Sequence, residues 1–431
     1  MCATLRTGGP ARLLIWAEVT SFDSSPTLTA WRALLAVAVV FVMLATTGWT
    51  AVRHERSDEP RAVALAAWAR GSLAGHPLPD ADASSNRLAR FFATLTAAQR
   101  TGLADKYPLV VGNLNGAPVD LRYQANRLAL KQARAAEEKR THDARLSYDG
   151  RAEAQRRMER FGSMLADGRQ FLAFDPSGKG RAAEVFGDLD RARRISVVVP
   201  GVDTNLMTLE RPAPKANTAP VGMAKSLYAA ERAAAPGTRT AVIAWADYTA
   251  PAGIGVDAAL GNLAQRGAVR LNALVDALPG NAPVSLFCHS YGSVLCGVAA
   301  HELPPRVTDI AVAGSPGMRV ERAGQLRTDA RVWATRDRGD WIQDVPNLEF
   351  GGLGHGADPV APGFGARVVS AGDAVGHSGY FEPGTRSLDN FAAIGVGAYG
   401  SVSCAASDSA CRAGITQSTG PGEGPAGPVA V

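Results

Sequence analysis

Short apolar runs that alternate with helical stretches constrain the fold more than any other feature of this sequence. The runs are "RISVVVPG", "RTAVIAWADY", "PVSLFCHS", "VTDIAVAGSPG", "ARVWATRD" and "ARVVSAGD", and stretches such as "VGMAKSLYAAERAAA" and "GSVLCGVAAHEL" separate the middle ones. Almost wholly apolar strands with helices between them are typical of a largely parallel sheet covered on both faces. The preceding "QFLAFDPSGKGRAAEVFGD" predicts two further strands, joined by a turn at 176–178, that form an antiparallel edge.

The composition permits a large core and argues against one class of partner. Of 431 residues, 46% are hydrophobic, 20% are charged, and the formal net charge is +5. Lys and Arg are scattered among nearly as many Asp and Glu, without a concentrated basic stripe. We therefore expect no nucleic-acid partner.

One segment is typical of a membrane anchor. From Ala33 to Val52 the chain reads "ALLAVAVVFVMLATTGWTAV", with no charge between Arg32 and Arg53. Twenty residues at helical rise span roughly 30 Å, the thickness of the hydrocarbon core of a bilayer. A buried core helix and a cleaved signal peptide are the alternatives, but the run is long for a signal sequence and no clean A-x-A site follows it. We predict a single-pass protein of the cell membrane.

The cysteines bear on the compartment. Cys2 precedes the apolar segment, and four others follow it as two close pairs, Cys288 with Cys296 and Cys404 with Cys411. Paired cysteines suit an oxidising compartment, although four free thiols are the alternative. We expect two disulfides and a catalytic domain outside the cytoplasm, since the flanking basic residues do not fix the topology.

Changes in composition and in the spacing of apolar residues along the chain predict five parts. These are an N-terminal tail (1–32), the anchor (33–52), a helical segment (60–168), the α/β domain (169–402) and a disordered tail (403–431). A long charged helical stretch is expected from about 121 to 165. Its interleaved opposite charges are typical of a solvated face, so we assign it no chemistry.

A serine follows the strand "VSLFC" and precedes the helix "GSVLCGVAAHEL". Ser290 and Gly292 supply the x-S-x-G part of a nucleophile elbow, a strained turn that exposes a serine hydroxyl at the carboxyl end of a sheet. Cys288 stands where the G-x-S-x-G pattern has its first glycine. Cysteine is small, so strand and helix can still approach each other, and we interpret Ser290 as a nucleophile.

The nucleophile needs a general base, and the chain order of this architecture places it downstream. His301 lies at the end of the helix that follows Ser290 and is expected on the surface. His355 lies in the glycine-rich "GGLGHGADP", and His377 follows the last predicted strand in "GDAVGHSGYF". A loop after the final strand is where the base belongs, so we favour His377 and keep His355 as the alternative.

The orienting acid is expected after the strand "ARVWA". Asp337 and Asp340 both lie there, in "TRDRGDWI", and their spacing does not separate them. Two backbone amides should form the oxyanion hole: that of Tyr291, directly after the nucleophile, and that of Val202, after the strand in "VVVPGVDTN". Asp203 and Asn205 are expected to hold this second loop.

Several separate motifs carry a resemblance to a known family. "CHSYGS", "VVVPG", "AGSPG" and "HGADPVAPGFGARV…HSGYF", with "YPLVVGNLNGAPVDLRYQANR" upstream, resemble an uncharacterised family of actinobacterial α/β-hydrolase proteins whose elbow usually reads GHSYGS. The resemblance covers about 103 to 397 and implies an α/β-hydrolase fold with Ser290 and His377 in a triad. The family's acid lies in a "GDPI"-like stretch that corresponds to "GDWI", which implies Asp340 rather than Asp337.

These observations predict a membrane-anchored serine hydrolase that acts on an ester or a related acyl substrate of small or lipid-like character. We expect no metal and no organic cofactor. An acyltransferase with the same triad is a close variant, and a non-catalytic binding module on the same fold is the alternative of another class. The apolar stretch "YTAPAGIGVDAALGN" is expected to line the mouth of the site.

Overall fold

The computed structural model of the protein describes residues 59–350 and 352–415. The predicted tail at 1–32 and the predicted anchor at 33–52 lie outside the described residues. Across the two described ranges, no helix combines the length and the apolarity needed to cross a membrane.

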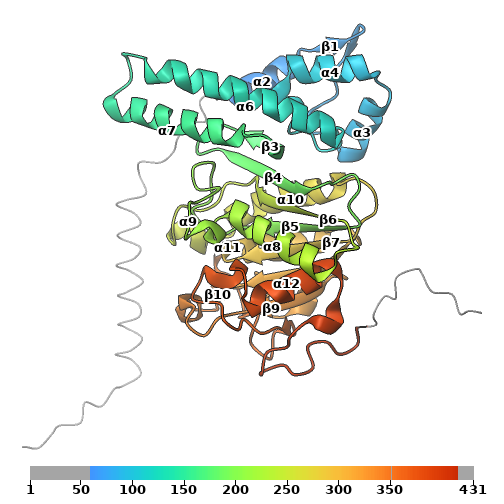
Figure 1. Ribbon diagram of the computed structural model, residues 1–431, viewed down its shortest axis with the longest axis vertical. Coiled ribbons are helices and arrows are strands. Elements are labelled where there is room, and N and C mark those ends of the chain that lie inside the picture. Colours follow the sequence, from blue (N-terminus) through green and yellow to red (C-terminus); the bar gives the residue numbers. More distant parts are fainter. Residues whose placement is uncertain (1–58, 351, 416–431) are drawn as a thin grey trace, which may run out of the picture. The chain divides into compact units, whose positions relative to one another are not determined.

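An eight-stranded, mostly parallel sheet forms the centre of the fold (Figure 1). Its strand order is β12-β9-β8-β7-β5-β6-β4-β3. The parallel strands are β5 (Arg194–Val199), β6 (Thr240–Ala246), β7 (Val284–His289), β8 (Val307–Ala313), β9 (Arg331–Thr335) and the short β12 (Arg367–Val368). Strands β5, β6 and β7 are buried almost along their whole length, which accounts for their nearly uninterrupted apolar sequences.

The predicted antiparallel edge is confirmed. β3 (Gln170–Asp175) pairs antiparallel with β4 (Arg181–Gly187), which pairs antiparallel with β6. Two side-chain amides cover the outer strand: Asn126 donates to the carbonyl of Phe171, and Asn113 exchanges hydrogen bonds with the backbone of Phe174. Covering an edge in this way prevents it from pairing with another chain.

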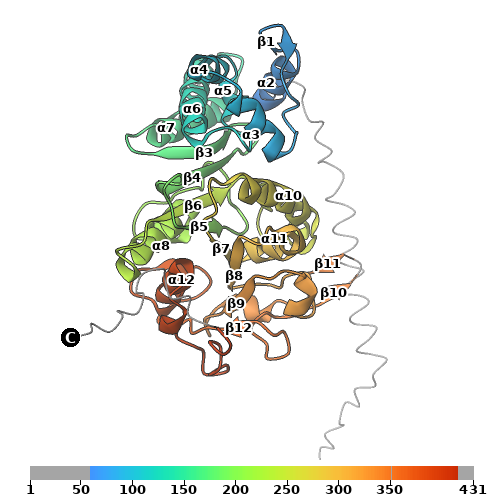
Figure 2. The ribbon, with the colours of Figure 1, turned by 90° about the vertical axis from the view of Figure 1, so that its right-hand side faces the viewer.

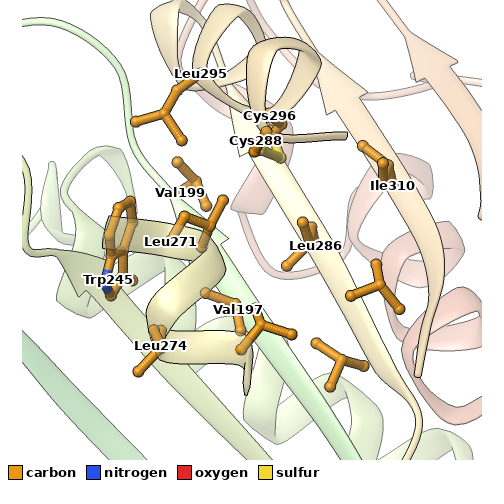
Figure 3. Packing of buried hydrophobic residues seen from close by; sticks show 14 of the residues in the cluster. Val197, Val199, Trp245, Leu271, Leu274, Leu286, Cys288, Leu295, Cys296 and Ile310 are labelled. Carbon is orange, nitrogen blue, oxygen red and sulfur yellow. A yellow bond between two sulfur atoms is a disulfide. The ribbon is translucent and has the colours of Figure 1, made fainter. Parts of the chain in front are cut away.

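Helices cover both faces of the sheet, and Figure 2 shows them on its two sides. α10 (Asn262–Ala277) and α11 (Tyr291–Ala299) pack on one face, where Leu271 and Leu295 meet Val197 and Leu286 (Figure 3). α8 (Pro220–Ala234) and α12 (Arg386–Val396) pack on the other face against alternate residues of the same strands. The sheet is therefore the middle layer of three.

Among the described residues, six helices precede the sheet. They are α2 (Pro60–Ala69), α3 (Ser85–Ala93), α4 (Ala97–Lys106), α5 (Pro108–Val111), α6 (Val119–Thr141) and α7 (Tyr148–Met164). The charged stretch expected as one helix is thus two, α6 and α7. Ser147 accepts a hydrogen bond from the amide of Gly150 and caps α7, while the turn before it is held by Asp143, which accepts from the amide of Arg145.

The remaining short elements lie in connections. They are the two-residue strands β1 (Ser72–Leu73), β2 (His76–Pro77), β10 (Glu349–Phe350) and β11 (Leu353–Gly354), and the helix α9 (Val256–Ala259). Residues 403–415, which the sequence assigns to a disordered tail, pack beside β12. Cys411 is buried in a disulfide with Cys404, and Arg367 donates to the carbonyl of Cys411, so two local interactions hold this segment.

Candidate active site

Ser290 stands at a strained corner between β7 and α11. Its backbone has φ 56° and ψ −129°, a region that non-glycine residues seldom adopt. The amide of Ser290 donates to the carbonyl of Ala313 at 3.0 Å, and the Ser293 hydroxyl donates to the carbonyl of Ser290. Such strain persists only where surrounding interactions enforce it, and it is frequent at functional sites.

Two glycines allow the backbone to approach this corner closely. A Cβ atom on Gly292 would lie 2.3 Å from the carbonyl oxygen of Val199, so a larger residue would push α11 away from β5. A Cβ atom on Gly201 would lie 2.6 Å from the Cβ of Ser290. The loop that begins at Gly201 therefore lies directly against the serine.

A disulfide spans the corner. Cys288, at the position of the missing elbow glycine, is bonded to Cys296 on α11, with a Cα–Cα distance of 6.5 Å (Figure 3). Both side chains are buried. The second pair, Cys404 and Cys411, is also bonded, so both expected disulfides are present in the structure.

The structure brings Ser290, His377 and Asp340 into one chain of hydrogen bonds. His377 Nε2 lies 2.8 Å from Ser290 Oγ, and His377 Nδ1 lies 2.8 Å from Asp340 Oδ1. The three residues follow β7, β12 and β9, whose carboxyl ends meet at one edge of the sheet. Because a carboxylate only accepts, Nδ1 carries the proton and Nε2 is free to accept one from the serine.

Hydrogen bonds hold Asp340 in its ionised form. Burial opposes ionisation, but donors from His377, from the Tyr380 hydroxyl at 2.5 Å and from the Ile342 amide at 2.9 Å outweigh it and lower the pKa of Asp340. A fixed anion in this position orients the imidazole and stabilises its protonated form.

The two alternative residues have other contacts. Asp337 accepts from the amides of Gly339 and Gly376, so it braces the loop that carries His377. The ring of His355 interacts with the carbonyl of Ala258 at 2.6 Å and lies edge-on to Tyr291. Burial lowers the pKa of His355, and no contact links its ring to Ser290 within the described residues. His301 is exposed, as the sequence predicts.

The two predicted oxyanion donors flank the serine. Tyr291 is the first residue of α11, and Val202 follows Gly201, which touches Ser290. In the described part of the chain, no backbone acceptor takes a hydrogen bond from either amide. Asp203 braces the Val202 loop, because its amide donates to Pro251 and its carboxylate accepts from Gly253.

Sequence reasoning missed three side chains around His377. His289 Nε2 lies 2.6 Å from the carbonyl of His377, and Tyr380 donates to Asp340. The indole of Trp341 lies 4.7 Å from the His377 ring, measured between centroids, and is 42% exposed. All three stand next to, or a few residues from, a predicted site residue, which is the only sequence signal that marks them.

No resident metal site is visible in the described ranges, where no group of three or more His, Cys, Asp or Glu side chains is arranged to hold an ion. The serine, the imidazole and the carboxylate form a nucleophile, a base and an orienting anion. Their geometry allows Ser290 to lose its proton to His377 as its oxygen attacks an electrophile.

Comparison with known proteins agrees with this fold. Residues 175–350 match the family model described as Alpha/beta hydrolase. Two uncharacterized Mycobacterium tuberculosis proteins, Rv2079 of strain H37Rv and MT2140 of strain CDC 1551, are each 26% identical to the chain over 74% of its length. The chain spans only 57% of the length of these relatives.

Solved structures with some likeness include two hydrolases. A dienelactone hydrolase from Anabaena variabilis is 17% identical, with a TM-score of 0.30, over 50% of this chain and 88% of that chain. A 2,6-dihydroxy-pseudo-oxynicotine hydrolase is 11% identical, with a TM-score of 0.33, over 72% of this chain and 96% of that chain. TM-scores this low identify neither a shared substrate nor a shared mechanism.

Proposed function

We propose that this chain is a serine hydrolase that cleaves an ester or a related acyl substrate; the family match over residues 175–350 and the mostly parallel sheet support an α/β-hydrolase fold. One observation carries the proposal: the unbroken hydrogen-bonded chain from Ser290 Oγ through His377 to Asp340. The strained elbow and the close glycines support it, because they are the means by which this fold presents a nucleophile.

The proposed reaction has two halves. Ser290 Oγ attacks the carbonyl carbon while His377 Nε2 takes the hydroxyl proton, and the Tyr291 and Val202 amides hold the negative oxygen. The ester bond then breaks, His377 returns the proton to the leaving alcohol, and an acyl-enzyme remains. Water attacks the acyl carbon and gives a proton to His377; the bond from that carbon to Ser290 Oγ then breaks, His377 returns the proton to Ser290 Oγ, and a carboxylic acid leaves. An alcohol in place of water would give acyl transfer.

Exposed apolar side chains support an apolar acyl group. Large hydrophobic residues are exposed in the loops that follow β6, β9 and β12, the parallel strands whose carboxyl ends border the site: Ile254, Val256, Trp341, Leu348, Leu353 and Val375. Trp341 also contacts the proposed base. Exposed apolar groups around a reactive centre favour a lipid-like substrate over a charged one.

The proposal includes attachment to the cell membrane through residues 33–52, with the hydrolase outside the cytoplasm. Support comes from the uncharged apolar segment and from the two disulfides, which persist in an oxidising compartment. We also assign the chain to the actinobacterial family with the GHSYGS-type elbow, on the motifs quoted above.

Covalent labelling with a fluorophosphonate probe tests the function. We expect one label on Ser290, no label in Ser290→Ala and at least a hundredfold slower labelling in His377→Ala, because the serine then lacks its base. His301→Ala is the matched control, since that exposed histidine is remote from the serine, and it should label normally. A folded wild-type protein that takes no label would contradict the hydrolase proposal and favour a non-catalytic binding module. Rates of hydrolysis of p-nitrophenyl esters with increasing acyl chain length would define the acyl preference.

A further inference from the structure

A cavity of about 910 Å³ lies among α2, α5, α6 and α7, and none of the residues of the Ser290 site lines it. Figure 2 shows α2, α5 and α6 beside one another at the end of the fold formed by the N-terminal helices. The volume falls within the range of about 300–1,000 Å³ that is usual for small-molecule sites. The proposed function does not use this cavity.

The walls of the cavity are apolar and incompletely packed. Val63, Ala64 and Ala67 of α2 face it together with Leu109 and Ala133. Val63 is 54% exposed, and of the ten residues of α2, "PRAVALAAWA", only Trp68 is buried. An aliphatic ligand in the cavity would remove this surface from water, which is favourable by about 25 cal/mol per Å².

The two ends of the cavity differ in charge. At one end, Arg140 and Arg157 are paired with Glu137. At the other end stand Arg70 and Lys106, for which no acidic partner is found among the described residues. Both cations come from the same end of the cavity, because Tyr107, the residue after Lys106, packs edge-on against Trp68, two residues before Arg70.

The cavity extends along α2, since residues from Pro60 to Arg70 line it. Ten helical residues measure roughly 15 Å at 1.5 Å per residue. The site therefore combines an elongated apolar body with two cations at one end. A ligand that complements it has an extended hydrocarbon chain and a single terminal anion.

We propose that this cavity binds a long-chain fatty acid, with the carboxylate between Arg70 and Lys106 and the hydrocarbon chain along α2, α5 and α6. The charge difference between the two ends fixes the direction of the chain. The proposal is independent of the proposed hydrolase activity, because it concerns binding at a site that contains none of the triad.

Titration of the full chain with cis-parinaric acid, a fluorescent 18-carbon fatty acid, tests this proposal. We expect saturable binding of one molecule per chain. Ala133→Trp and Ala136→Trp place an indole in the cavity and should each weaken binding at least tenfold, while Ala135→Trp, on an exposed residue of the same helix that does not line the cavity, should leave it unchanged. Two filling variants are needed because Ala133 is partly buried and its replacement can disturb folding.

Competition identifies the anionic end. Palmitate should displace the probe at least tenfold better than hexadecanol, and the double variant Arg70→Gln/Lys106→Gln should remove that preference. Equal displacement by the acid and the alcohol would contradict the carboxylate site. Two other results would overturn the proposal. One is that both filling variants fold and bind the probe as the wild type does, which would place the probe outside the cavity. The other is that the wild type shows no saturable binding.

Discussion

At the scale of single residues, the division of labour between Asp340 and Asp337 can be tested directly. Asp340→Asn keeps the shape of the side chain but removes the anion that orients His377, so we expect kcat to fall by roughly 10³–10⁴-fold. Asp337→Asn weakens only the brace on the Gly376 loop, so kcat should fall less than tenfold, at a stability cost of about 1 kcal/mol. Turnover of an activated ester by the two purified variants, with melting temperatures as the folding control, measures both. Equal losses of kcat would contradict this assignment.

The same pair of residues marks where reasoning from spacing stops, since only the family resemblance favoured Asp340 over Asp337. Ser290 was predictable, because an apolar strand and an apolar helix enclose it. Asp337 and Asp340 follow the same strand three residues apart, so which one faces His377 depends on how the intervening turn folds. In the structure, Asp340 caps a short 3₁₀ turn by accepting from Ile342, and this capping directs its other contacts toward His377 and Tyr380. No periodicity encodes that direction.

At the scale of elements, the Cys288–Cys296 disulfide joins the strand and the helix that position Ser290. The entropy of closing so short a loop predicts that Cys288→Ala/Cys296→Ala lowers the free energy of unfolding by about 2–3 kcal/mol. Cys404→Ala/Cys411→Ala is a matched control, because its loop is one residue shorter and lies outside the site. We expect a similar loss of stability from both double variants, but a several-fold loss of kcat only from the first.

Urea unfolding and ester turnover of the two double variants check this prediction. If both variants lose kcat equally, the disulfides act through overall stability alone. If neither loses kcat, the Cys288–Cys296 disulfide is not needed to position Ser290.

The elements themselves were largely predictable from apolar periodicity. The break between α6 and α7 was not, because charged helical spacing continues across it and only the cap at Ser147 ends the pattern. The order of residues 403–415 depends on a disulfide that spacing suggests but cannot place against β12.

At the scale of the whole molecule, two buried groups make the stability depend on pH in opposite directions. Burial, reinforced by the nearby His377, lowers the pKa of His289 to about 4. The free energy of unfolding therefore decreases as pH falls from about 6.5 toward 4, because the unfolded state binds a proton that the folded state does not. Burial raises the pKa of Glu231, whose carboxyl meets the hydroxyl of Ser196, to about 8. The native state thus keeps a proton that the unfolded state releases above its ordinary pKa, and stability falls as pH rises toward 8. The two effects oppose each other up to about pH 6.5, and above it only Glu231 contributes.

Glu231→Gln tests the decrease in stability that Glu231 causes as pH rises, because glutamine has a similar shape and does not ionise. From pH 6.5 to 8.5 the free energy of unfolding of the wild type should fall by roughly 2 kcal/mol through Glu231, about 1.4 kcal/mol for each pH unit below its folded pKa. In Glu231→Gln that decrease should disappear, whereas Glu138→Gln, which changes an exposed carboxylate on α6, should retain it. Urea unfolding at the two pH values, with both disulfides intact, measures the difference. The same slope in wild type and Glu231→Gln would mean that the folded protein holds Glu231 ionised at neutral pH, so that its hydrogen bond from Ser196 outweighs its burial.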